Sequence, residues 1–555
     1  MVASSSRREF LVIGGGVAGL ATLGTGTLLA ACGSDTVSAP TTTAAAVATT
    51  APVVATTAPV VATSATWVAN NIAENLDPAI GMDSNSLMFI RNAYDGLYTY
   101  APGSTEVLST LAAGHEVSAD GLVYTFSMKQ GITFSDGAPF TAQDVAASYE
   151  RVQAINAGPA RYFSRMESFR AIDDETFEIR LNGPYSYLLG LLPWLPIVST
   201  AAVDANKTAD DPWAQTYFAT NAAGTGPYVL EAREGQTKIT MALRDDYWGD
   251  VGSKAPATLA MSKVVDPTTK LQLLDNNEAQ LTGGGFGPTE FAGAATLQNV
   301  ELVRQPGLTL RTMALNTQRT PTDDPVLREA LVYLFDYAAY SDYYAGYGDP
   351  ATGPLPPGFP GSRPSEEAYT QDIDRAAMLL EQGGYIDSGV ELSFVAVQGA
   401  DFGAFAGTLL QSALAEFGIA LETKSLPWPQ IPPIQADTQS AFHISFLNIS
   451  ANTPDPTDVL IKQYASANWG TDGGYNWAYY ADPEFEAIME RAQSASNSSD
   501  AEQAIGEAVD LVTAAYPTIY AISPQLVQPV HKDWTFAKYD ALYNLQVTRP
   551  VHYDA

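Results

Sequence analysis

The stretch "GLVYTFSMKQGITFSDGAPFTAQDVAASYERV" (residues 121–152) contains the transition from strand to helix that decides the fold. Residues 121–128 are β-branched and aromatic, which predicts a short strand. Thr141 with Asp144 three residues later has the spacing of a capped helix start. Val145, Tyr149 and Val152 then form one apolar stripe, which predicts an amphipathic helix packed on a sheet.

The same alternation of strand and helix recurs along the chain. Short strands are expected at 176–181, 238–243 and 441–447. Helices are expected after Asp324-Pro325 and Asp482-Pro483, and a further helix is expected to end at Gly383-Gly384. Residues 390–425 follow a strand–helix–strand pattern. The sequence therefore predicts an α/β protein with additional β-rich segments.

Composition excludes several classes of function. The 555 residues include 61 acidic and 28 basic side chains, a net charge of −33, and such a surface does not suit nucleic acid. Only one cysteine, Cys32, is present, so no disulfide framework is expected. The four histidines (115, 443, 531, 552) are scattered, and no metal site or cofactor is predicted.

The first 31 residues have the features of an export signal. Gly14, Gly16 and Gly19 fit a dinucleotide-binding spacing, but no second strand ending in an acid follows them. "SRREFLV" instead resembles the twin-arginine export motif, with Arg7 and Arg8 in place, and no charge interrupts residues 10–31. An uncleaved membrane anchor is the remaining alternative.

"LAAC" (29–32) resembles a lipoprotein box, in which Cys32 is acylated and becomes the first mature residue. Residues 32–66 are then expected to form a tether, because Thr, Ala, Val, Pro and Ser offer too little to bury. The expected location is extracytoplasmic, with lipid attachment to the outer face of the cell membrane or a periplasmic position.

Several stretches occur together in the order of one known family. "NLDPAI" (75–80), residues 111–152, "GTGPYVL" (224–230), residues 315–336 and "TPDPTDVL" (453–460) resemble the peptide- and nickel-type solute-binding proteins of ABC importers, family 5. The resemblance runs from about residue 70 to 520.

The resemblance implies a bilobal periplasmic-binding-protein-like type II fold of the large class. Two crossing strands would join the lobes, and an extra subdomain would be inserted in lobe I. The implied division places lobe I at 67–95, 222–312 and 520–555, the inserted subdomain at 96–221 and lobe II at 313–519.

The family's peptide-gripping residues are altered in this chain. Dipeptide-binding members have an Asp three residues before the D-P of the ligand loop and an Arg after a V-Q pair. The corresponding positions here are Asn452 and Gly399. An enclosed zwitterion needs an opposite charge at each end, so a free dipeptide is not the expected solute. Longer peptides, neutral or sugar-like molecules, cationic solutes and a haem or chelated metal stay open as solutes, whereas the scarcity of histidine disfavours a bare metal ion.

Other residues of the expected cleft are aromatic or lie near the first lobe's opening segment. Trp428 matches a position where the family often places a ligand-facing aromatic, and ordinary packing is its alternative. Trp469, Tyr475 and Trp477 could stack on a flat solute or form a core edge. Met82 and Asp83 lie where relatives line the cleft, although Asp83 equally suits a helix cap.

The leading hypothesis is therefore a binding protein without chemistry, a monomer that delivers a small solute to an ABC permease and its ATPase subunits. A secreted hydrolase acting on sugars or peptides is the alternative; it needs converging carboxylates or a nucleophile–base pair. A receptor that senses the solute without importing it is a third class.

Overall fold

The computed structural model describes residues 63–101, 104–251, 255–470, 474–495, 497–536 and 551–553. The predicted export signal with Arg7 and Arg8, the acylation site Cys32 and most of the predicted tether lie outside these residues. The body was expected to begin at Trp67, but strand β1 already begins at Ser64 and pairs with residues 258–263.

The first large sheet has seven strands in the order β12-β19-β11-β1-β10-β9-β8. Its strands are β1 (Ser64–Ala69), β8 (Tyr228–Glu234), β9 (Lys238–Leu243), β10 (Thr258–Lys263), β11 (Leu281–Gly283), β12 (Val300–Gln305) and β19 (Leu526–His531). β1 runs parallel to β10 and β11, and α5 (Pro267–Asp275) and α6 (Pro288–Ala294) pack near β12 and β19.

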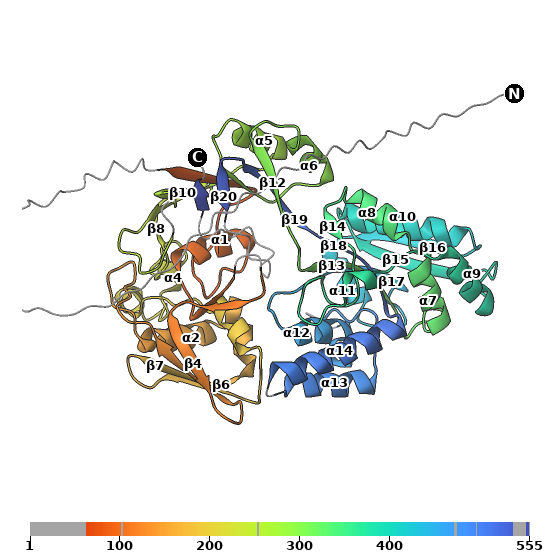
Figure 1. Cartoon of the computed structure of the whole chain (residues 1–555), viewed down its shortest axis with the longest axis horizontal. Coiled ribbons are helices and arrows are strands. Elements are labelled where there is room, and N and C mark those ends of the chain that lie inside the picture. The colour runs from red at the N-terminus through yellow and green to blue at the C-terminus, as the bar shows by residue number, and fades with distance from the viewer. Residues whose placement is uncertain are drawn as a thin grey trace, which may run out of the picture. The chain divides into compact units, whose positions relative to one another are not determined.

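The second large sheet has six strands in the order β14-β18-β13-β17-β15-β16. Its strands are β13 (Thr309–Leu315), β14 (Gly348–Asp349), β15 (Glu391–Val397), β16 (Ala420–Leu426), β17 (Ile444–Ser450) and β18 (Thr518–Pro524). Figure 1 shows α7 (Pro325–Leu334), α9 (Ile373–Gln382) and α10 (Asp401–Ala415) beside this sheet. Helices α12 (Pro456–Tyr464), α13 (Pro483–Gln493) and α14 (Ser498–Ala515) pack against one another.

A four-stranded sheet is built from the chain between β1 and β8. Its order is β4-β5-β7-β6, with β4 (Ala112–Val117), β5 (Val123–Met128), β6 (Met166–Ala171) and β7 (Thr176–Leu181). Helix α2 (Ala142–Ile155) packs on it, and the stripe of Val145, Tyr149 and Val152 is buried as the sequence predicts. Asp144 accepts the Thr141 backbone N–H at 2.9 Å and so completes the expected cap.

Most local expectations are confirmed, and one strand is displaced. Strands at 176–181 and 238–243 have the predicted bounds, and α7 and α13 begin at Pro325 and Pro483 after Asp caps. The strand expected at 441–447 is β17, which begins three residues later at Ile444. β17 is buried on both faces through Leu447, so no alternation in the sequence marks its start.

The two large sheets are joined where the chain passes from β12 to β13 and from β18 to β19. These two crossings lie in contact. A Cβ placed on Gly307 would stand 2.0 Å from the carbonyl oxygen of Pro524. The Ser523 hydroxyl donates to the carbonyl oxygens of Gly307 at 3.1 Å and Thr309 at 3.0 Å. Only a residue without a side chain fits at this crossing.

A buried ion pair ties the first lobe to the inserted segment. Arg151 near the end of α2 donates two hydrogen bonds to the Asp77 carboxylate, at 2.7 and 2.6 Å, and both side chains are fully buried. Arg151 also donates to the carbonyl oxygen of Trp213. The L-D-P segment and the 141–152 helix, two of the stretches that define the resemblance, are thus one structural unit.

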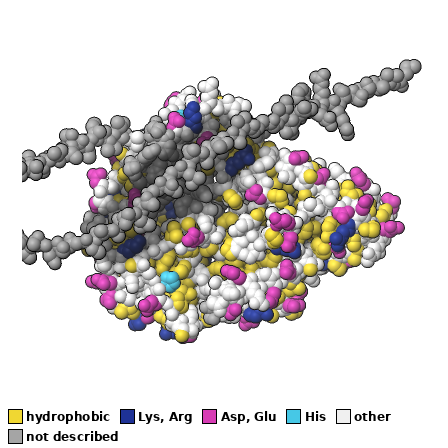
Figure 2. Space-filling view, in the orientation of Figure 1, with side chains coloured by type: hydrophobic (Ala, Val, Ile, Leu, Met, Phe, Trp, Pro, Cys, Tyr) yellow, Lys and Arg dark blue, Asp and Glu magenta, His cyan; other side chains and the backbone are white. Residues whose placement is uncertain are grey.

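Acidic side chains are more frequent than basic ones on the visible surface (Figure 2). Figure 2 shows Asp and Glu side chains scattered over this face, with fewer Lys and Arg among them. Within the described ranges, no helix combines the length and apolar character that a membrane crossing requires.

The crossing at Gly307 generates a test of the fold. Gly307→Ala places a methyl group against the Pro524 backbone, and we expect a loss of about 1–3 kcal/mol in the free energy of unfolding, measured by urea denaturation. Gly293→Ala in α6 is the matched control, because its Cβ meets no atom within 4 Å and alanine favours the helix. Wild-type stability of Gly307→Ala would show that the crossing is loosely packed.

Candidate functional site

Three predicted site residues follow three parallel strands of the second sheet. β15 pairs in parallel with both β16 and β17. Gly399 comes after β15, Trp428 after β16 and Asn452 after β17. Carboxyl ends of neighbouring parallel strands meet at one edge, where ligands of open α/β sheets bind. The structure therefore brings Gly399, Trp428 and Asn452 to one edge.

The loop that carries Asn452 is covered by a segment that sequence reasoning did not select. Trp194 donates its indole N–H to the carbonyl oxygen of Asn452 at 2.9 Å. A Cβ on Gly190 would overlap Cγ of Pro454, so the Gly190 backbone packs directly against the Pro454 ring. The covering segment is rich in aromatic and apolar residues, "PYSYLLGLLPWLPIV" (184–198), and that composition is the signal that could have found it.

Asp455 links this loop to the covering segment. It is the N-cap of α12, and its Oδ1 accepts from the Thr457 N–H at 2.8 Å and hydroxyl at 2.6 Å. Its Oδ2 accepts the Tyr185 hydroxyl at 2.6 Å, and Asp455 is only 2% exposed. The turn-shaping role expected for Asp455 is present, together with a contact across 270 residues of sequence.

Burial changes the acidity of both partners in this contact. Desolvation raises the pKa of the Asp455 carboxyl, and the hydrogen bonds from Thr457 and Tyr185 only partly oppose it. The pKa of the Tyr185 hydroxyl is raised well above its ordinary value, first by burial and then by the negative charge of Asp455. The proton therefore stays on Tyr185, which acts as the donor.

A cavity of about 410 Å³ opens beside this contact, within the usual size range of small-molecule sites. One part of its lining comes from the short helix η1 (Gly158–Arg165) and the covering segment, and the other part comes from residues 452–462 and Gln493. Charged and polar groups predominate: Arg161, Arg165, Asn452, Thr453, Asp458 and Lys462 are among them. Asp458 is ion-paired with Lys462 at 2.6 Å.

Two of the predicted aromatic residues form a stack. The rings of Trp428 and Trp477 lie 5.6 Å apart at 18°; Trp477 is buried, whereas Trp428 is 43% exposed. Trp477 thus covers one face of the Trp428 ring, and the other part of that ring is exposed at the sheet edge. Trp469 instead donates its indole N–H to the carbonyl oxygen of Tyr480, and Tyr475 is part-buried against the core.

Met82 and Asp83 have different positions. The Asp83 carboxylate accepts the backbone N–H groups of Asn85 and Ser86 at 3.0 Å each, so it caps α1 (Ser84–Ala93). Met82 lies against the start of η1, where a Cβ on Gly158 would stand 3.2 Å from Met82 Cγ. Met82 therefore supports the helix that supplies Arg161 and Arg165 to the cavity.

Gly399 supplies space without a side chain. Its φ is +82°, and no atom lies within 4 Å of a Cβ built there. In the described ranges, no group of three His, Cys, Asp or Glu side chains is placed to hold a metal ion.

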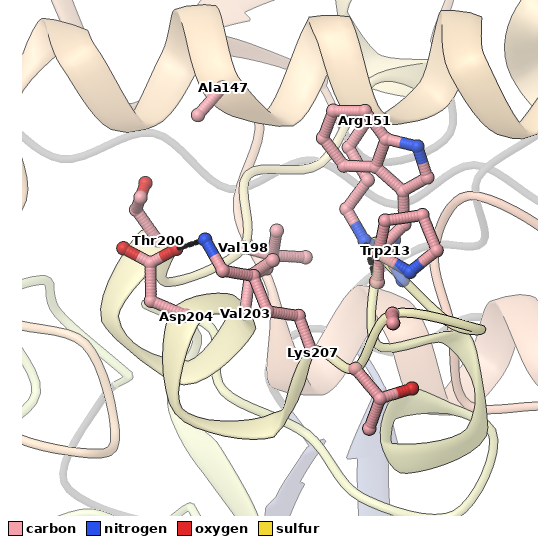
Figure 3. Close-up of a pocket in the computed structure, with 11 residues that line it drawn as sticks. Ala147, Arg151, Val198, Thr200, Val203, Asp204, Lys207 and Trp213 are labelled. Carbon is pink, nitrogen blue, oxygen red and sulfur yellow. Dashed lines mark hydrogen bonds and ion pairs between the residues drawn. The ribbon is translucent and has the colours of Figure 1, made fainter.

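A second cavity, of about 610 Å³, lies elsewhere and contains none of the predicted residues. Figure 3 shows Ala147 and Arg151 on α2 at one side, and Asp204 and Lys207, an ion pair at 2.7 Å, at the other. Its lining comes entirely from residues 147–213 and is mostly apolar. The cavity beside Asn452 is the better candidate, because it joins distant segments and contains uncompensated polar groups.

Comparison with known proteins gives the family. Residues 106–471 match the family described as "Bacterial extracellular solute-binding proteins, family 5 Middle". The chain belongs to this family. The sequence resemblance is confirmed, and the relatives give the hydrolase alternative no support.

Individual relatives agree with this assignment. The chain is 27% identical over 471 residues to the glutathione-binding protein GsiB of Salmonella typhi, covering 83% of this chain and 89% of GsiB. It is similar in structure to HbpA2 of Haemophilus parasuis, with a TM-score of 0.79, 23% identity, and coverage of 89% and 100% of the two chains. DppA of Helicobacter pylori, solved with the peptide STSA, gives a TM-score of 0.68 at 23% identity, covering 89% and 98%. The bilobal type II fold is confirmed.

The Tyr185–Asp455 contact predicts a pH-dependent stability. Asp455 has a higher pKa in the folded protein than in the unfolded chain, so its protonated form stabilises the fold. This stabilisation is complete at pH values below the ordinary carboxyl pKa near 4. It is lost as the pH rises through the raised pKa of the folded protein. Tyr185→Phe raises that pKa further. We expect urea denaturation to show a loss of about 1.5–3 kcal/mol at pH 7 and a smaller loss at pH 4.

Tyr187→Phe is the matched control, since the Tyr187 hydroxyl makes no hydrogen bond to the described residues while its ring packs beside Tyr185. Equal losses for Tyr185→Phe at pH 7 and pH 4 would contradict the role of the ionised Asp455.

Proposed function

We propose that this protein is the membrane-anchored receptor of an ABC importer, which encloses a small peptide-like solute between its lobes and passes it to a permease. The observation that carries the proposal is the cavity at Asn452. It lies at the carboxyl edge of one sheet and is covered by residues 158–191 of another part of the chain. Such a site can release its solute by separation of the two parts, without bond breaking.

The family assignment supports capture rather than chemistry. Differential binding is sufficient for delivery: a form closed on its solute presents a surface to the permease that the open form lacks. We propose that the two crossings near Gly307 and Pro524 are the hinge of this movement, since they are the backbone links between the two large sheets.

Peptide-like solutes are proposed because named relatives bind glutathione or a peptide. A simple zwitterionic dipeptide fits poorly. Asn452 and Gly399 carry no charge, and burial of an ammonium or carboxylate without an opposite charge is costly. The exposed face of Trp428 offers a surface for the apolar part of such a solute.

Export and anchoring are proposed from the sequence alone. Arg7 and Arg8 precede an uncharged run, and Cys32 ends a lipoprotein-like box. Acylation of Cys32 would hold the body at the outer face of the membrane through the Thr/Ala/Pro-rich tether, as a monomer beside the permease.

The capture hypothesis is tested by the solute itself. We expect native mass spectrometry of the purified body to show a small co-purified molecule. We expect calorimetry to give an affinity for glutathione or Ser-Thr-Ser-Ala at least about tenfold tighter than for Ala-Ala. Tight binding of Ala-Ala would refute the reading of Asn452 and Gly399, and turnover of a bound peptide would refute capture without chemistry.

The export hypothesis has a separate test in cell fractions. Arg7→Lys with Arg8→Lys is expected to leave the precursor in the cytoplasm, whereas Cys32→Ala is expected to move the exported protein from the membrane to the soluble fraction. Arg170→Gln, on an exposed strand of the body, is the control and should fractionate as the wild type does. Membrane retention of Cys32→Ala would argue for an uncleaved anchor.

A further inference from the structure

Two arginines of the cavity lack a carboxylate partner. The Arg165 guanidinium lies 5.0 Å over the ring of Tyr185. Arg161 lies 5.0 Å over the ring of Tyr162 and donates to its hydroxyl at 3.0 Å. Among the described residues, neither is ion-paired. Both residues line the cavity, so their charge is available to a bound group.

The two carboxylates that line the same cavity have other partners. Asp458 pairs with Lys462, and Asp455 accepts hydrogen bonds from Tyr185 and Thr457. Among the described residues, therefore, no carboxylate of the lining forms an ion pair with Arg161 or Arg165. This contrasts with Arg151, whose buried guanidinium is fully matched by Asp77.

A buried hydroxyl in the same cavity is also unsatisfied. Thr453 is 3% exposed, and no group of the described residues forms a hydrogen bond with its Oγ1. The neighbouring Asn452 uses its backbone carbonyl for Trp194, and its side-chain amide makes no hydrogen bond to the described residues. A buried polar group without a partner destabilises the protein, and a bound molecule that supplies a partner removes this cost.

We propose that this cavity binds a carboxylate group of the solute, with Arg161 and Arg165 supplying the charge and Thr453 and Asn452 supplying hydrogen bonds. The inference rests on the proposed function and adds the chemical class: a small peptide-like solute with excess negative charge. Planar guanidinium groups match a carboxylate in two parallel hydrogen bonds. Dipeptide-binding relatives have an arginine at the position of Gly399. In this proposal the corresponding positive charge is supplied by η1, a different part of the chain.

Four proteins test this assignment by calorimetry. The wild type, Arg161→Gln/Arg165→Gln, Thr453→Val and the control Arg170→Gln are titrated with Ala-Ala-Glu and with the neutralised analogue Ala-Ala-Gln amide. We expect the wild type to bind Ala-Ala-Glu at least about tenfold more tightly than the amide. The double variant should lose that preference, and Arg170→Gln, whose arginine pairs with Glu178 outside the cavity, should keep it.

Thr453→Val separates binding from folding. Because Oγ1 has no partner in the free protein, the variant should bind Ala-Ala-Glu several-fold more weakly while its unfolding midpoint in urea stays equal to or above that of the wild type. Competition by inorganic phosphate at the same site, with no preference for the carboxylate peptide, would assign the arginines to a phosphate-bearing solute and overturn the proposal.

The outcomes distinguish this inference from the proposed function. An unchanged preference in the double variant, or equal binding of the acid and the amide, overturns the inference and leaves solute capture standing. A neutral co-purified solute does the same. Absence of any bound solute or peptide in the wild type overturns both.

Discussion

Close backbone contact between two crossing segments is the constraint on which the two-lobed arrangement depends. Gly307 lies directly against the Pro524 carbonyl, and the Ser523 hydroxyl donates to the carbonyl oxygens of Gly307 and Thr309. The two large sheets are linked through this point, and in the described residues no strand of one sheet pairs with a strand of the other. A relative movement of the lobes must therefore be taken up by the torsion angles of a few residues at the crossings, while each sheet stays intact.

The site depends on contacts of a second kind, between segments that lie far apart in sequence. The Asp77–Arg151 pair fixes α2 to the opening segment of the first lobe, and Met82 packs against η1 in the same region. Tyr185 and Trp194 then meet the loop that follows β17. The contacts of Arg151 and Met82 position η1, and those of Tyr185 and Trp194 hold the covering segment on the loop after β17. Together they place Arg161 and Arg165 at the cavity. The L-D-P and F-T-A-x-D-V segments that identify the family thus have a structural reason to occur together.

Helices and strands were predicted well from the sequence, because helix caps and the alternation of apolar and polar residues in strands depend only on residues close together in the chain. Asp324, Asp482 and Thr141 mark helix starts, and the strand–helix–strand pattern predicted at 390–425 corresponds to β15, α10 and β16. Asp83 could be a cap or a ligand from sequence, and the two backbone N–H groups that it accepts establish the cap.

What could not be predicted depends on pairing across the chain. The residues next to Arg161 and Arg165 in sequence do not indicate that these arginines form no ion pair. The outcome depends on Asp455 and Asp458, which bind Tyr185 and Lys462 instead. The start of β17 was misplaced because strands buried on both faces lack an alternating pattern. The covering role of residues 184–198 follows only from contacts about 260 residues away along the chain.

The position of β19 has a consequence for synthesis of the protein. This strand, residues 526–531, lies between β12 and β11 in the first sheet, although all strands of the second sheet come before it in the chain. Until the ribosome has passed residue 531, β11 and β12 each present an unpaired edge that can recruit other chains. Products truncated before this strand would therefore be aggregation-prone, and the nascent first lobe needs shielding until β19 has been synthesised.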